Sequence, residues 1–136
     1  MKIAIVGSSH LSEGEERTAR QLSATILKSY VKNHGIENVI LISGGAKGVD
    51  TQAEDVAKGL GIKCKIFKPT EWNWDGYKVR NMAMAQECDI LYCLPTKLKI
   101  EPCYHCNATD HERSGACWTM KHAKSLKKEV HLFPLI

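Results

Sequence analysis

Short runs of branched apolar residues recur five times along the chain, at residues 3–6, 39–42, 64–67, 90–94 and 130–133. Each run is nearly continuous rather than alternating, which is typical of strands covered on both faces of a parallel sheet. Stretches with helical spacing separate the runs, and the clearest places Ala19, Leu22, Ile26 and Tyr30 on one stripe. This order predicts an α/β fold with a five-stranded parallel sheet between two layers of helices.

Capping signals mark the expected ends of the first two helices. Each has a capping-box pair at its start and a glycine past its end, namely Ser12, Glu15 and Gly35 for the first and Thr51, Glu54 and Gly61 for the second. We expect the third helix over residues 77–87 and the fourth over residues 117–127. The longest irregular segment covers residues 95–114. A loop of this length inside a compact domain is expected to have a function or to be held by a cross-link of its own.

The composition fits a single globular domain over residues 1–136. The chain is 43% hydrophobic and 25% charged, a balance that allows a proper core to form. No apolar run approaches the roughly 20 residues that cross a bilayer, and the N-terminal apolar stretch is too short for a secretory signal. We therefore expect a cytoplasmic protein without a membrane partner.

Positive charge is mild and gathers near the C-terminus. The formal charge is +4, and its one visible concentration is Lys121, Lys124, Lys127 and Lys128. Lysines on the outer face of a helix are most often simply solvated, so nucleic acid is a candidate partner but not the favoured one.

The stretch "SGGAKGVD", residues 43–50, leads from the second strand straight into the second helix. Its glycines would let backbone N–H groups approach an anion, and the helix turns its positive end to the same point. The candidate ligand contacts in this loop are Ser43, Gly44, Gly45, Lys47, Gly48 and Asp50. The spacing is neither the dinucleotide nor the Walker pattern, so a tight turn with a helix-capping aspartate is the alternative.

The loop after the third strand, "KPTEWNWDGYKVRN", carries further candidates. The carboxyl ends of parallel strands gather at one edge of a sheet, so this loop should lie near the glycine loop. Trp72 or Trp74 would stack on a base, Arg80 would pair with a phosphate, and Asn81 would read a base or ribose edge. Alternatively, one tryptophan packs under the loop and its acidic residues neutralise Arg80.

These stretches together resemble the SLOG superfamily, whose relatives include the DprA and LOG proteins. The resemblance is carried by "MKIAIVGSS", "ISGGAKGVDTQAEDVAKGLGI", "VRNMAMAQECDILYCLP" and "SGACWTMKHAKSLKKEV". It extends to the small single-domain branch that has a "GGARGAD"-like loop followed by an "RN" pair. It covers nearly the whole chain apart from residues 95–113.

The resemblance implies a Rossmann-like fold that binds a nucleotide or nucleotide-derived phosphorylated ligand at the C-terminal ends of the strands, and it implies a homo-oligomer. Beyond the glycine loop it points to Gly7, Ser8, Arg80, Asn81, Gly115 and Thr119. Relatives that cleave N-glycosidic bonds carry a "PGGxGTxxE" motif with a catalytic glutamate. Here the segment reads "SGACWTMKH", and no glutamate follows Thr119.

A cysteine-rich insertion over residues 95–115 predicts a structural zinc site. Cys103 and Cys106 form a CxxC pair, and His111 and Cys117 follow at nearly the spacing of a zinc knuckle. Three thiolates and an imidazole would complete a closed tetrahedral site. The alternatives are His105 or Cys93 as a ligand, free thiols, or a Cys117 that belongs to the buried face of the fourth helix. The three cysteines in apolar runs, at 64, 88 and 93, are expected to act as small hydrophobic residues.

Three functions compete on these observations. The leading one is a module that binds a nucleotide-like small molecule. The second is an enzyme acting on a nucleoside phosphate, with Asp50 or Glu112 as its acid, base or nucleophile, and a crevice carboxylate with a raised pKa would favour it. The third is a single-stranded nucleic-acid-binding protein of DprA type. The catalytic residues of an enzyme are not assigned by the sequence.

Overall fold

The computed structural model describes residues 1–96 and 115–135. Its elements in chain order are β1 (Lys2–Gly7), α1 (Glu13–His34), the short 3-10 helix η1 (Ile36–Asn38), β2 (Ile40–Ser43), α2 (Val49–Leu60), β3 (Lys63–Ile66), α3 (Trp74–Glu87), β4 (Ile90–Leu94), α4 (Gly115–Ser125) and β5 (Glu129–Leu132).

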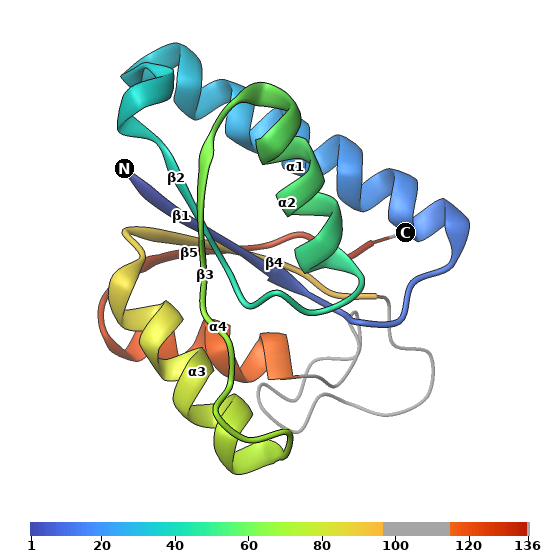
Figure 1. Cartoon of the computed structure of the whole chain (residues 1–136), viewed down its shortest axis with the longest axis vertical. Helices are drawn as coiled ribbons and strands as arrows, with labels where there is room; N and C mark the ends of the chain where they lie inside the picture. Colours follow the sequence, from blue (N-terminus) through green and yellow to red (C-terminus); the bar gives the residue numbers. More distant parts are fainter. Residues whose placement is uncertain (97–114, 136) are drawn as a thin grey trace.

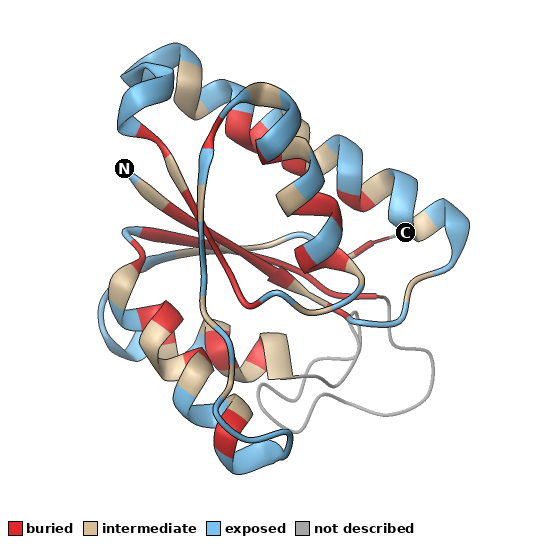
Figure 2. Ribbon diagram, viewed as in Figure 1, coloured by how far each residue is buried: buried red, intermediate tan, exposed pale blue. Residues whose placement is uncertain are grey.

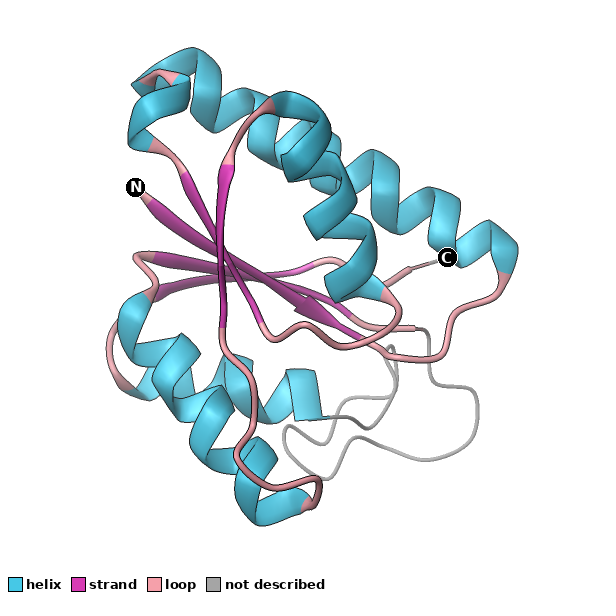
Figure 3. Ribbon diagram, viewed as in Figure 1, coloured by secondary structure: helices cyan, strands magenta, loops and turns pink. Residues whose placement is uncertain are grey.

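The five strands form one parallel sheet in the order β3-β2-β1-β4-β5. Helices α1 and α2 pack together on one face of this sheet, and α3 and α4 pack together on the other (Figures 1 and 3). The predicted α/β fold with a parallel sheet between two helical layers is confirmed. The chain reverses the direction of its winding between β1 and β4, which is where open sheets of this kind form a crevice.

The core divides between the two faces of the sheet because neighbouring residues of a strand point in opposite directions. Ile3 and Ile5 of β1 pack in the cluster beneath α1 and α2, whereas Ala4 and Val6 pack in the cluster beneath α3 and α4. The middle strands are buried on both faces, as their continuous apolar runs predict (Figure 2). The edge strands β3 and β5 depart from that prediction, since most of β3 is exposed and β5 contains no buried residue.

The expected boundary signals hold at both ends of α1 and at the C-terminal end of α2, where Gly61 is the C-cap, but not at the start of α2. Ser12 accepts a hydrogen bond from the Glu15 N–H at 3.2 Å, while the Glu15 carboxylate accepts from the Ser12 N–H at 2.9 Å, which confirms the capping box. The corresponding prediction for Thr51 is wrong, because α2 begins three residues earlier after Gly48. The Thr51 hydroxyl instead donates to the Ala46 carbonyl at 2.8 Å.

The later helices keep their expected places with shifted ends. Helix α3 begins at Trp74 rather than Tyr77, because the Asn73 side chain caps it by accepting from the Gly76 N–H at 3.0 Å. Helix α4 lies two residues nearer the N-terminus than expected. Among the helices that the structure describes, none has both the length and the apolar character needed to cross a membrane.

Candidate functional site

A cavity of about 820 Å³ lies at the C-terminal edge of the sheet, where the strand-to-helix loops meet. Its described lining comes from the ends of β1, β2 and β3 and from α3 and α4. The lining residues are Val6, Gly7, Ser8, Ser9, Gly44, Gly45, Ala46, Lys47, Asp50, Lys68, Pro69, Trp72, Trp74, Tyr77, Arg80, Asn81, Met84, Gly115, Ala116 and Thr119. Cavities of this size hold small molecules and cofactors.

Most of the predicted ligand contacts lie together in this cavity. The cavity brings together ten of the twelve predicted ligand contacts and leaves out Ser43 and Gly48. The Ser43 hydroxyl points elsewhere and donates to the Glu54 carboxylate of α2 at 2.8 Å. These two residues therefore contribute to the structure of the loop and do not line the cavity.

Gly48 joins the first two strand-to-helix loops. Its φ is +78°, and a side chain there would collide with the backbone of Ser8 and Ser9. The first N–H of α2, that of Val49, donates to the Ser8 carbonyl at 3.1 Å. One of the N–H groups expected to meet an anion is thus already used within the protein.

Ser8 also has a structural partner of its own. Its side chain is buried, lies 3.3 Å from the Thr96 hydroxyl and accepts from the Thr96 N–H at 2.9 Å. These contacts tie the end of β1 to the residues that follow β4. Gly7 lies beside them, where a side chain would collide with Val49 and the Leu94 carbonyl.

Arg80 lies in the middle of α3, lines the cavity and is held there in a fixed orientation. Its Nη1 donates to the Gly44 carbonyl across the cavity floor at 2.6 Å, and its Nε donates to the Asn81 side-chain oxygen at 2.7 Å. The guanidinium also lies 5.7 Å from the centre of the Tyr77 ring. Partial burial lowers the pKa of Arg80, but arginine stays charged. The Asn81 amide group, whose oxygen is occupied, is left with its NH₂ as a donor.

Asp50 is the second residue of α2 and its side chain is almost fully buried. Its Oδ2 accepts from the Ala46 N–H of the glycine loop at 3.2 Å. The alternative that Asp50 caps the helix is wrong, because Ala46 precedes α2 and no side chain caps the start of that helix. Burial raises the pKa of Asp50 from 3.8 to about 7, while the Ala46 N–H and the charge of Arg80 oppose that rise. The crevice therefore contains a carboxyl group that titrates near neutral pH.

Two tryptophan rings, those of Trp72 and Trp74, also line the cavity. Trp72 is 80% exposed and Trp74 is 43% exposed, so neither is packed under its loop. Trp74 meets Trp118 of α4 edge to face, with 5.5 Å between ring centres. Tyr77 and Lys68 also line the cavity, although the sequence did not single them out. Their positions carried a signal, since Lys68 directly follows a strand and Tyr77 lies one helical turn before Arg80.

Helix α4 closes the cavity from the side of its N-terminus. Gly115 and Thr119 line it, and the Thr119 hydroxyl donates back to the Gly115 carbonyl at 2.8 Å. Three residues after Thr119, where the glycosidic relatives carry glutamate, stands His122. Its ring stacks on Trp118 with 5.4 Å between centres and is not part of the cavity lining.

The predicted zinc ligands Cys103, Cys106 and His111 lie outside the described residues, as does Glu112. Cys117 is described and is fully buried in the first turn of α4. Within the described part of the chain, no group of three or more metal-ligating side chains is close enough to hold a metal ion.

Comparison with known proteins bears on the fold. No family model and no curated protein sequence matches the chain. Three solved structures superimpose on nearly all of it, however. DNA processing protein A (DprA) from Streptococcus pneumoniae matches with a TM-score of 0.67 at 20% identity, over 96% of this chain and 49% of that one.

DprA from Helicobacter pylori matches with a TM-score of 0.67 at 17% identity, over 97% of this chain and 64% of that one. The structural genomics target TM1055 matches with a TM-score of 0.65 at 15% identity, over 95% and 71% of the two chains. The chain shares its Rossmann-like fold with these three structures. The resemblance seen in the sequence is thus confirmed at the level of the fold. The chain spans about half to two thirds of the two DprA proteins.

Proposed function

We propose that this domain binds a nucleotide or a nucleotide-derived phosphorylated molecule in the cavity at the C-terminal edge of its sheet. One observation carries the proposal. The same cavity is lined by basic side chains from three segments, Lys47, Lys68 and Arg80, and by the rings of Trp72 and Trp74. Cations bind phosphate and aromatic rings stack on bases, so a nucleotide satisfies both kinds of group at once.

The basic groups differ in how they would act. Lys47 and Lys68 are exposed at the cavity and can follow a phosphate in several positions. Arg80 is partly buried and already held by Gly44 and Asn81, so it binds without losing much side-chain freedom. Affinity would therefore depend most on Arg80, and the lysines would adjust it.

Calorimetry with the four ribonucleoside 5′-monophosphates, with inorganic phosphate as a reference, tests the proposal. Trp72→Ala should weaken nucleotide binding about tenfold, as expected for one lost stacking contact, without lowering the melting temperature. Val79→Ala is the matched control, because Val79 is 64% exposed on α3 and lies outside the cavity lining. Failure of every nucleotide to bind at millimolar concentration would refute the proposal.

An enzyme acting on a nucleoside phosphate is the second candidate. It is favoured by Asp50, a buried carboxyl with a pKa of about 7 in the cavity wall, since general acids and bases work best near the ambient pH. His122 at the position of the family's catalytic glutamate argues against the known glycosidic mechanism. Release of free base from nucleoside monophosphates, lost in Asp50→Asn, would favour this enzyme over a binding module.

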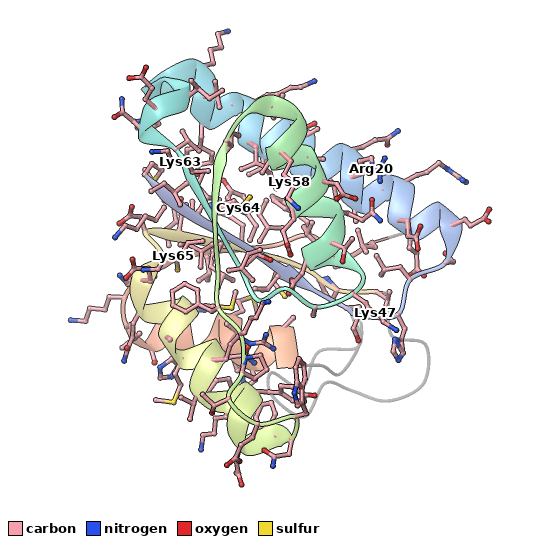
Figure 4. The ribbon with its side chains drawn as sticks, in the orientation of Figure 1. Arg20, Lys47, Lys58, Lys63, Cys64 and Lys65 are labelled. Carbon is pink, nitrogen blue, oxygen red and sulfur yellow. The ribbon has the colours of Figure 1, made fainter. Side chains whose placement is uncertain are left out.

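Single-stranded DNA is the third candidate ligand. The Helicobacter pylori structure is described for the single-stranded DNA binding mode of that protein. In this chain, Lys47, Lys58, Lys63 and Lys65 lie around α2 and the edge strand β3 (Figure 4). Fluorescence anisotropy with a labelled oligonucleotide at rising salt tests it, because a phosphate-binding surface loses affinity steeply with salt.

We also propose that the insertion binds a structural zinc through Cys103, Cys106, His111 and Cys117. The support is the ligand spacing, which is close to that of a closed tetrahedral site.

A further inference from the structure

The cavity holds a buried acid, Asp50, within the glycine loop region that the sequence predicts to bind an anion. Asp50 is 7% exposed and lines the cavity beside the glycine loop. A second negative charge next to a buried carboxylate is strongly unfavourable in a poorly hydrated site. A phosphate group therefore binds better toward Lys47 and Lys68 than beside Asp50. Arg80 lies next to Asp50, so it contributes to nucleotide affinity through a contact other than the phosphate.

Asp50 and Arg80 approach the same small space from α2 and α3. A Cβ built on Gly44 would lie 2.7 Å from Arg80 Nη1 and 3.0 Å from Asp50 Oδ2. In this described part of the chain the two side chains nevertheless form no ion pair within 4.0 Å. Glycine at position 44 thus allows the acceptor Asp50 and the donor Arg80 to lie close to each other in the cavity wall.

Asn81 adds a second donor to this space. It is 8% exposed and lines the cavity, and its oxygen accepts from Arg80 Nε at 2.7 Å. That bond fixes the amide so that its NH₂ is left to donate. A carboxylate has about four acceptor positions, and the hydrogen bond from Ala46 uses only one oxygen of Asp50.

A hydroxyl group fits such surroundings because it donates and accepts at once. Two neighbouring hydroxyls can donate to one carboxylate while they accept from a guanidinium or an amide NH₂. We infer that Asp50, with Arg80 and Asn81, binds the 2′- and 3′-hydroxyls of a ribose, so that the cavity selects ribonucleotides over 2′-deoxyribonucleotides. This inference rests on the proposed nucleotide-binding function and narrows it to ligands with a free ribose diol.

The test compares each ribonucleoside 5′-monophosphate with its 2′-deoxy counterpart by calorimetry on the full chain. We expect the deoxy form to bind the wild type at least about tenfold more weakly, since a buried acceptor and donors lose their partner. Asp50→Asn should narrow this ratio to less than about threefold. Asp55→Asn, on an exposed residue of the same helix, should leave the ratio unchanged.

The possible outcomes distinguish selectivity for ribose from nucleotide binding itself. Equal affinity for both sugars in the wild type overturns the ribose inference and leaves nucleotide binding intact. Absence of binding by either series overturns both. The wild-type comparison needs no variant, so a poorly folding Asp50→Asn would not obscure it. The same diol occurs at the 3′ end of RNA, and ribo-oligonucleotides with and without a 3′-phosphate show whether a strand end binds in place of a free nucleotide.

Discussion

At the scale of single residues, the site depends on how burial affects the ionisation of two side chains of opposite charge, Asp50 and Arg80. Asp50 and Arg80 both face the cavity, and burial disfavours the charged form of each. Neither neutralises the other by direct contact, because each is occupied by backbone groups of the glycine loop. The site is thereby held ready for a ligand at a cost to stability, which is a common feature of functional sites.

Asp50→Asn should make the protein more stable at alkaline pH. The pKa of Asp50 is about 7 in the folded protein against an ordinary 3.8, so the folded state favours the protonated form. The stability that Asp50 contributes is full below about pH 4 and is lost as the pH rises through 7. Glu54 raises this pKa further, and Arg80 lowers it.

We expect the variant to exceed the wild type in free energy of unfolding by on the order of 2 kcal/mol at pH 8, since one pKa unit corresponds to about 1.4 kcal/mol. Urea denaturation at pH 4.5 and 8 measures the difference. Asp55→Asn, whose side chain is 52% exposed, should show no such pH dependence. Parallel pH profiles for the wild type and Asp50→Asn would contradict the assigned titration.

Arg80→Lys should weaken nucleotide binding although it keeps the positive charge. Lysine cannot contact the Gly44 carbonyl and the Asn81 oxygen simultaneously in a fixed fork. We expect about a tenfold loss of affinity in calorimetry, with a loss of stability of about 1 kcal/mol. Lys78→Arg, an exposed change on α3 outside the cavity lining, is the control. Wild-type affinity in Arg80→Lys would mean that only charge matters at this position.

At the scale of elements, the glycine loop acts as a joint between β1, β2 and α2. The Val49 N–H binds the Ser8 carbonyl, Gly48 passes close to the Ser8 and Ser9 backbone, and Arg80 reaches back from α3 to Gly44. Two strand-to-helix connections and helix α3 are thus fastened to one another. The loop positions the cavity wall even where it makes no contact with a ligand.

Two glycine substitutions on the same element should have opposite effects. Gly48→Ala places a side chain at a positive φ and against the Ser8 backbone, so it should lower the free energy of unfolding by about 2 kcal/mol or more. Gly59→Ala lies near the end of α2 with nothing within 4 Å, and should raise it by about 0.5–1 kcal/mol. Chemical denaturation measures both, and a tolerated Gly48→Ala would show that the two loops are not joined as described.

At the scale of the whole molecule, a parallel sheet covered on both faces supports a site built from strand-to-helix loops, from the N-terminal ends of α2 and α4 and from one side of α3. Both core clusters lie along the strands, whereas the cavity lies at the edge toward which all the strands point. Changes at the cavity should therefore alter binding more than folding. The insertion is expected to depend on its predicted zinc for stability, because its sequence contains few apolar residues.

The purified chain should contain about one zinc ion, which mass spectrometry of the metal content would measure. The double change of Cys103→Ser and Cys106→Ser should reduce zinc to background and lower the melting temperature, because two of the four ligands are lost. Cys64→Ser, on the edge strand, should retain full zinc content. Metal-free wild-type protein purified without chelator would count against the predicted site.

The sequence by itself determined the order of the elements and most members of the site. Continuous apolar runs and a helical stripe are local patterns that survive in any α/β packing, and parallel strands bring their following loops to one edge. For that reason the motifs along the chain are enough to assign Gly44, Asp50, Arg80 and Asn81 to one cavity.

Only the tertiary structure decided what each of these groups contacts. The Ser43 hydroxyl binds the Glu54 carboxylate, and Thr51 does not cap α2 because that helix begins three residues earlier. The side chains of Asp50 and Arg80 both lie beside Gly44. Such partners come from segments up to 36 residues apart, whose approach depends on how the helices pack on the sheet. Spacing along the chain defines which residues share a face or a loop. It does not define how side chains from different loops pack together, and that packing sets the burial that raises the pKa of Asp50 and the shape of the space beside it.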